Sequence, residues 1–243
     1  MKNRWLWKSV LIAGMIVSIS AADESGNRVE AAAPIKSSIE QVMAHVQSKV
    51  AFSSYLEATY TFQNASTQNQ TLIKVWDNTL NGKLRREEQR NQEPMHVYKS
   101  QEGKALLYVR GQASASLYNS GVSVKDNQLN RTVEELKRLQ LTTNSTRVDE
   151  EEVLNRTAYH LSGKGKTLER IINVGGKQEK LLQKQPDVEL WIDSETGLLL
   201  KKISTLNGDT SIYTVNKVEF QSSFDQSLFV LNVPKGVTII ETK

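Results

Sequence analysis

The chain has 243 residues, a formal net charge of +4 and no cysteine. The lack of cysteine excludes a disulfide framework, thiolate metal sites and a cysteine nucleophile. Three basic residues lie in the first eight positions, so without them 28 basic residues (31 − 3) face 27 acidic ones, a net charge of +1. A near-neutral chain with interspersed charges gives no electrostatic basis for nucleic-acid binding, so we expect no nucleic-acid partner.

The N-terminus has the layout of a secretory signal peptide. Lys2, Arg4 and Lys8 form a basic region, residues 9–22 are uncharged and mostly apolar, and Ser20 and Ala22 are the small residues of a cleavage site. We therefore predict a signal peptide over residues 1–22, a polar tether over 23–37 and an extracytoplasmic protein. If the signal stays uncleaved, the segment would instead anchor the chain in a membrane.

The pattern of residues 38–118 predicts one helix followed by several strands. Ser37 or Ser38 caps the helix, which runs to about residue 49, and a Glu or Gln three positions later completes a capping box. Strand-like patterns follow at 56–63, 70–77, 83–90, 96–100, 104–110 and 113–118. The strand at 83–90 is strongly charged, which is typical of a sheet edge or a solvent-facing strand.

The middle of the chain predicts a second helix over 132–141, with Asn130 or Thr132 near its cap. The acidic run at 149–152 is interpreted as a solvated turn. Strand-like patterns return at 153–162 and 166–174, and two consecutive glycines at 175–176 mark a turn.

The last third of the chain predicts an antiparallel meander. Runs at 188–193, 198–205 and 210–220 are separated by turns at 194–197 and 207–208, and each turn contains a glycine that accepts positive φ. A turn at Asp225 and a last apolar run over 228–233 follow. The order of helix, strands, helix and strands predicts an α+β fold in which a curved, mostly antiparallel sheet forms one domain over 38–243.

The sequence contains no recognisable catalytic or metal-binding motif. None of His45, His96 and His160 has a second histidine three to five positions later, and no nucleophile elbow, phosphate loop or calcium loop occurs. We therefore predict a protein that is not an enzyme and needs no metal or cofactor.

Several strands are apolar on both faces. Residues 198–200 are three consecutive leucines, and residues 106–109 are a continuous run of apolar and aromatic residues. A sheet with one solvated face alternates apolar and polar residues. Continuous runs therefore indicate that both faces are covered, either by an ordinary two-sided core or by helices that close an apolar cavity.

The C-terminal residues resemble the outer-membrane lipoprotein carrier (LolA) superfamily. The resemblance rests on VELWIDSETGLLLKKIST at 188–205, YTVNKVEF at 213–220 and, above all, SLFVLNVPKGVTII at 227–240. It implies an incomplete β-barrel whose apolar concave face is covered by helices. Carriers have a basic residue followed by proline near the end of the second strand, where this chain has Trp76, Asp77 and Asn78, so the chain is more similar to Gram-positive members.

The resemblance implies a monomeric, non-enzymatic protein that holds a lipid, an acyl chain or a lipoprotein in the cavity. The alternative is an envelope sensor, like the anti-sigma regulators of the superfamily, that binds an extracytoplasmic segment of an envelope membrane protein. The expected cavity-lining residues are Tyr60, Phe62, Trp76, Leu107, Val109, Leu136, Leu139, Leu190 and Leu200.

Overall fold

A computed structural model describes residues 38–49, 52–101, 103–119, 127–140, 147–165, 169–174, 177–182 and 185–242. The predictions for 1–22, 23–37 and 175–176 concern segments outside these residues. The described residues include two α-helices, α1 (Ile39–Gln47) and α2 (Gln128–Gln140). The predicted capping box of α1 is confirmed, because Ser38 Oγ accepts from the Gln41 amide and the Gln41 side chain accepts from the Ser38 amide.

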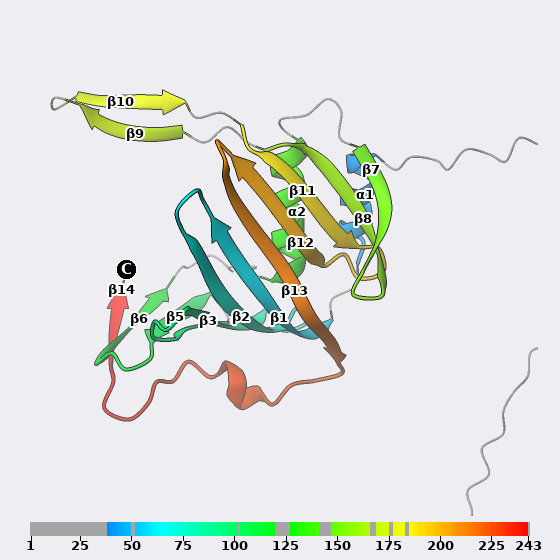
Figure 1. Ribbon diagram of the computed structural model, residues 1–243. Coiled ribbons are helices and arrows are strands. Elements are labelled where there is room, and N and C mark those ends of the chain that lie inside the picture. The colour runs from blue at the N-terminus through cyan, green and yellow to red at the C-terminus, as the bar shows by residue number, and fades with distance from the viewer. Residues whose placement is uncertain are drawn as a thin grey trace, which may run out of the picture. The chain divides into compact units, whose positions relative to one another are not determined.

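Twelve of the described strands form one open, curved sheet (Figure 1). Their order across the sheet is β14-β6-β5-β4-β3-β2-β1-β13-β12-β11-β8-β7, and all neighbours are antiparallel except β14 and β6. The bounds are β1 (Ser53–Gln63), β2 (Gln68–Asn78), β3 (Lys83–Arg90), β4 (His96–Gln101), β5 (Lys104–Val109), β6 (Ser114–Asn119), β7 (Arg147–Val153), β8 (Arg156–Lys164), β11 (Asp187–Asp193), β12 (Leu199–Leu206), β13 (Asp209–Gln221) and β14 (Thr238–Thr242). The predicted α+β fold with a curved, mostly antiparallel sheet is therefore confirmed.

β9 (Glu169–Val174) and β10 (Lys177–Leu182) pair with each other in a separate two-stranded sheet. Among the described residues, neither helix has the length and apolar character that a membrane crossing requires.

Both helices pack on the same face of the large sheet, which we call the concave face; the opposite face is the convex face (Figure 1). The main core lies between the helices and strands β7, β8 and β11. α1 contributes Ile39, Val42 and Val46, which recur at helical spacing and are all buried. The other buried members are Leu136, Leu139, Val148, Leu161, Val188, Leu190 and Ile192.

A second cluster on β11 and β12 explains why these strands are apolar on both faces. Trp191 and Leu200 pack there with Ala158 and Leu198. The register between β11 and β12 shifts after Trp191, which is opposite Lys201, whereas Ile192 is opposite Leu199. The extra residue, Leu200, breaks the strict alternation, so three consecutive leucines are all accommodated.

The C-terminal meander of β11, β12 and β13 is confirmed, and its second turn has the predicted chemistry. Asn207 and Gly208 have φ values of 53° and 89°. Positive φ at both central residues is the condition for the two-residue hairpin turn that matches strand twist. The apolar run after Asp225 becomes a 3-10 helix, η1 (Gln226–Phe229), and an irregular segment.

Of the two alternatives predicted for β3, the sheet edge is wrong, because β3 is an interior strand between β2 and β4. Its charged side chains are nevertheless partly exposed to solvent. Its charges are tolerated because they pair along the strand. Arg85 forms an ion pair with Glu87 on one face, and Arg86 forms one with Glu88 on the other.

The turn predicted at 149–152 is wrong, because these residues belong to edge strand β7, but the run is solvated as predicted, since residues 150–152 are exposed. The turn lies later, at Leu154 and Asn155, which both have φ of 56° and divide the predicted strand 153–162 into β7 and β8. Charged side chains on an edge strand protect it from pairing with another sheet.

The second helix begins earlier than predicted, at Gln128, so the predicted caps Asn130 and Thr132 lie inside it. The Asn127 side chain accepts a hydrogen bond from the Asn130 amide at 2.8 Å. Asp77 of β2 accepts one from the Gln128 amide at 2.6 Å, and the Asp77 side chain is almost fully buried. A carboxylate distant in sequence thus accepts a hydrogen bond from a backbone amide that has no partner within α2.

Candidate functional site

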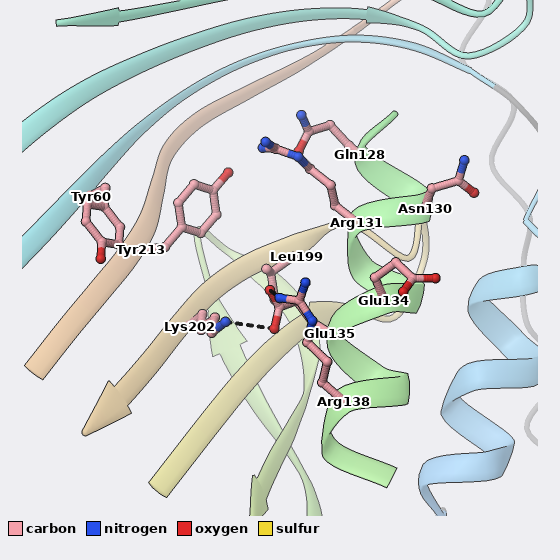
Figure 2. Close-up of a pocket in the computed structure, with 10 residues that line it drawn as sticks. All are labelled: Tyr60, Gln128, Asn130, Arg131, Glu134, Glu135, Arg138, Leu199, Lys202 and Tyr213. Atoms are coloured by element: carbon pink, nitrogen blue, oxygen red, sulfur yellow. Dashed lines mark hydrogen bonds and ion pairs between the residues drawn. The ribbon is translucent and has the colours of Figure 1, made fainter. Parts of the chain in front are cut away.

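A pocket of about 560 Å³ opens between α2 and strands β1, β12 and β13 (Figure 2). Its volume falls within the range of about 300–1,000 Å³ that is usual for small-molecule sites. One side is formed by the polar stripe of α2 and the other by the concave face of the sheet. The lining residues are Tyr60, Gln128, Asn130, Arg131, Glu134, Glu135, Arg138, Leu199, Lys202 and Tyr213.

Strand register brings the sheet side of the pocket together. Tyr60 of β1 is directly opposite Tyr213 of β13, and Tyr213 is directly opposite Lys202 of β12. Directly opposite residues on adjacent strands face the same side of a sheet. The two tyrosine rings and Leu199 therefore form an apolar wall, with Lys202 at its border (Figure 2).

One carboxylate of α2 organises the charges of the pocket. Glu135 accepts from Lys202 Nζ at 2.7 Å and from Arg138 at 3.2 Å. The Glu135 side chain is 19% exposed and that of Lys202 is 25% exposed. The contact ties α2 to β12 across the pocket floor, as the dashed line in Figure 2 shows.

Tyr213 stays a neutral phenol at physiological pH. Burial raises its pKa to about 12, against an opposing effect of nearby Arg86. A neutral hydroxyl in an aromatic wall can donate a hydrogen bond to a bound molecule.

A second concave-face pocket, of about 420 Å³, adjoins the first. It is lined by Arg86, Glu88, His96, Tyr98, Leu107 and Arg131. Because Arg131 lines both pockets, they are neighbours on the concave face, and we call the two pockets together the trough.

The nine predicted cavity residues are distributed over five places. Tyr60 lines the larger pocket and Leu107 lines the smaller one. Phe62 and Val109 are half-buried and line neither. The fully buried residues Leu136, Leu139 and Leu190 belong to the core between the helices and the sheet.

The remaining two residues lie on the other side of the sheet. Trp76 is beside Tyr55, with ring centroids 5.0 Å apart, and the Arg85 guanidinium is 5.3 Å from the Trp76 ring centre. Its strand neighbour Val75 packs in the concave-face cluster, so Trp76 faces the convex side. Leu200 packs with Trp191 in the bulge cluster.

Sequence reasoning missed most of the polar lining of the larger pocket. The signal was present in α2, where Gln128, Arg131, Glu135 and Arg138 recur at helical spacing and form one stripe. Such a stripe is normally solvated, and only the tertiary fold reveals that it faces Tyr213. The described residues contain no cluster of three or more metal-ligating side chains.

No family model matches the sequence, and no curated protein matches it. The fold is similar to the crystal structure of an uncharacterized conserved protein from Thermus thermophilus, with 11% identity and a TM-score of 0.52. The match covers 84% of this chain and 98% of that chain.

Other solved structures match with lower TM-scores. The MucA/MucB complex of Pseudomonas aeruginosa has a TM-score of 0.47 and 11% identity, over 83% of this chain and 62% of that chain. A LolA-superfamily protein from Nitrosomonas europaea has a TM-score of 0.37 and 9% identity, over 80% of this chain and 98% of that chain. At such identities these similarities concern the fold alone. The architecture that the C-terminal residues predicted, an open and curved antiparallel sheet with helices on its concave face, is the one observed.

Proposed function

We propose that this chain is a non-enzymatic, extracytoplasmic binding protein that holds the acyl part of a lipid or lipoprotein on the concave face. The trough beside α2 carries the proposal. Tyr60, Tyr213 and Leu199 offer an apolar wall to a hydrocarbon chain, and the cationic groups of Lys202 and Arg138 border it. An acyl chain would bind there because each methylene removed from water contributes about 0.8 kcal/mol.

The trough differs from the cavity that the sequence predicted. The space between the helices and β11 is filled by Leu136, Leu139 and Leu190, so the ligand would lie on the polar-striped side of α2 instead. A ligand with an anionic head group and an apolar chain suits walls of this mixed character.

The first test is lipid analysis of the protein purified without detergent from its native compartment. Organic extraction and mass spectrometry should find an acyl-containing molecule at near-stoichiometric amount. A series of fluorescent fatty acids should then bind about fourfold more tightly for each added methylene until the trough is filled. A lipid-free protein whose affinity does not change with chain length would refute the proposal.

A matched pair of variants tests the location. Tyr60 and Tyr118 are both 39% exposed, but only Tyr60 lines the trough. Tyr60→Glu should weaken fatty-acid binding about tenfold or more, because a carboxylate on the apolar wall loses hydration when the chain binds. Tyr118→Glu should leave it unchanged, and equal effects of both substitutions would contradict the placement.

A second candidate function is an envelope module that binds a segment of another protein. The observation that favours it is β14, an open edge strand of the sheet whose Ile239 and Ile240 side chains are 40% and 53% exposed. Exposed edges accept an added strand. The test places a photo-crosslinker at position 240 in the native envelope. The control places it at Leu72, which is equally exposed (54%). One defined protein should be captured from position 240 and none from position 72.

A further inference from the structure

The segment that follows β13 lies across the convex face of β3 and β4. It is attached by three basic side chains, each of which donates to a polar group of the segment. Lys83 donates to Gln226 Oε1 at 2.9 Å, and Arg85 donates to the Leu228 carbonyl at 3.4 Å. Lys99 donates to the Val230 carbonyl at 2.9 Å and to Asn232 Oδ1 at 3.0 Å.

A pocket of about 330 Å³ lies between this segment and strands β3 to β5. Strand register places two rows of residues side by side across β3, β4 and β5: Arg85, Lys99 and Leu106 in one row, and Arg86, Tyr98 and Leu107 in the next. The row with Arg86 lines the concave trough. Because neighbouring residues on a strand face opposite sides, the row with Arg85 faces the convex side. The residues that line the convex pocket are Arg85, Val97, Lys99, Leu106, Tyr108, Arg110, Asn232, Val233 and Pro234.

The described lining of this pocket is cationic and contains no carboxylate. Arg85, Lys99 and Arg110 bring three positive charges. Glu87 is beside them and accepts two hydrogen bonds from the Arg85 guanidinium, whose third goes to the neutral Leu228 carbonyl. Three positive charges less one negative charge leave two positive charges around the pocket.

Lys99 is the most buried of these three cations. It is only 7% exposed, and the two acceptors that its ammonium contacts on the segment are neutral. An ammonium has three donors, so one remains for a further acceptor. Burial, followed by the charge of Arg85, lowers the pKa of Lys99, while Glu87 opposes this effect. A buried cation without its own carboxylate favours a bound anion.

We propose that the convex pocket binds the phosphate group of a phosphate monoester. Lys99 and the guanidinium groups of Arg85 and Arg110 would contact the phosphate oxygens, because guanidinium and ammonium donors match a dianion in charge and geometry. Val97, Leu106 and Val233 would contact the organic part, since the pocket volume exceeds what a phosphate alone needs. The site is on the opposite face of the sheet from the trough, so it does not depend on the acyl-binding function.

The probe is phenyl phosphate, compared with inorganic phosphate and titrated into the full-length protein by calorimetry at low ionic strength. We expect a dissociation constant of about 1 mM or tighter for phenyl phosphate and weaker binding of inorganic phosphate. Arg110→Gln should weaken binding about tenfold, because Arg110 is exposed at the turn after β5 and its loss should leave the fold intact. The control Lys104→Gln, an exposed cation at the other end of β5, should have no effect.

Co-sedimentation with phosphatidylcholine vesicles that contain phosphatidic acid distinguishes the source of the phosphate. Sedimentation that Arg110→Gln abolishes would identify a lipid head group, and phenyl phosphate binding without sedimentation would identify a soluble monoester. No binding of either probe, or equal binding by the Arg110→Gln protein, would overturn the proposal. Tyr60→Glu should leave phosphate binding unchanged, which separates this site from the trough.

Discussion

Replacing Asp77 with alanine should loosen the attachment of α2 to the sheet. The carboxylate is 1% exposed and accepts from the Gln128 amide at the start of α2, at 2.6 Å. A hydrogen bond to a charged group contributes about 1.5–3 kcal/mol, and a carboxylate at a partly buried helix N-terminus contributes up to about 2 kcal/mol. Relief of carboxylate desolvation offsets part of this sum. We therefore expect the free energy of unfolding to fall by about 2–3 kcal/mol.

Urea unfolding followed by circular dichroism measures this change, and amide hydrogen exchange localises it. Exchange should accelerate mainly in α2. Asp77→Asn keeps an acceptor but loses the charge, so it should cost less than alanine, and Asp209→Ala at the exposed hairpin start is the control. A change below about 0.5 kcal/mol for Asp77→Ala, or an asparagine variant as unstable as the alanine variant, would refute the reasoning.

Three further predictions concern the core and the pH dependence of stability. In urea unfolding, Gly197→Ala should lower the free energy of unfolding more than Gly208→Ala. Both glycines have positive φ, but only at Gly197 would an added Cβ meet helix side chains, at 3.3 Å. Equal losses of stability would count against tight packing at Gly197. Leu136→Ala should cost about 2–5 kcal/mol because it is fully buried, while fatty-acid affinity of the folded protein stays constant; a selective loss of affinity would place Leu136 in the binding site. The Trp191 indole, and then His160, lower the pKa of Glu151, so its contribution is complete above the usual value of 4.5 and is lost as pH falls through the lowered pKa. Glu151 is 47% exposed, so Glu151→Gln should remove less than about 1 kcal/mol at pH 7 and nothing at a pH below the lowered pKa; a loss that persists in acid would show that charge is not the cause.

Local chemistry made much of the fold predictable. The capping box at Ser38 and the positive-φ turn at Asn207 and Gly208 require only neighbouring residues, so these features could be found from the sequence. The edge alternative for the charged strand β3 is wrong because its ions pair within the strand, and Arg85 also donates to a backbone carbonyl more than a hundred positions away. Contacts with so distant a segment cannot be predicted from the neighbouring residues.

The candidate site was less predictable than the fold because it depends on which face each side chain takes. In β2, apolar residues occupy both phases of the alternation, and only pairing with β1 fixes Val75 on the concave side and Trp76 on the convex side. The pairing of Lys202 with Glu135 depends on how α2 crosses β12. Neither the strand register nor the way that α2 crosses β12 can be predicted from the residue spacing within one segment.

The position of β1 has a consequence for the order of folding. β1 lies between β2, its sequence neighbour, and β13, which pairs Gln221 with Ser53. During synthesis β2 to β6 can form a local meander, but one side of β1 keeps its backbone donors and acceptors unpaired until nearly the whole chain has emerged. Pairing of such distant segments is slow, on the order of milliseconds to seconds. Until β13 pairs with it, β1 is an unpaired edge strand, although it becomes an interior strand in the folded sheet. A chaperone that binds unpaired strands would therefore have most time to bind at β1.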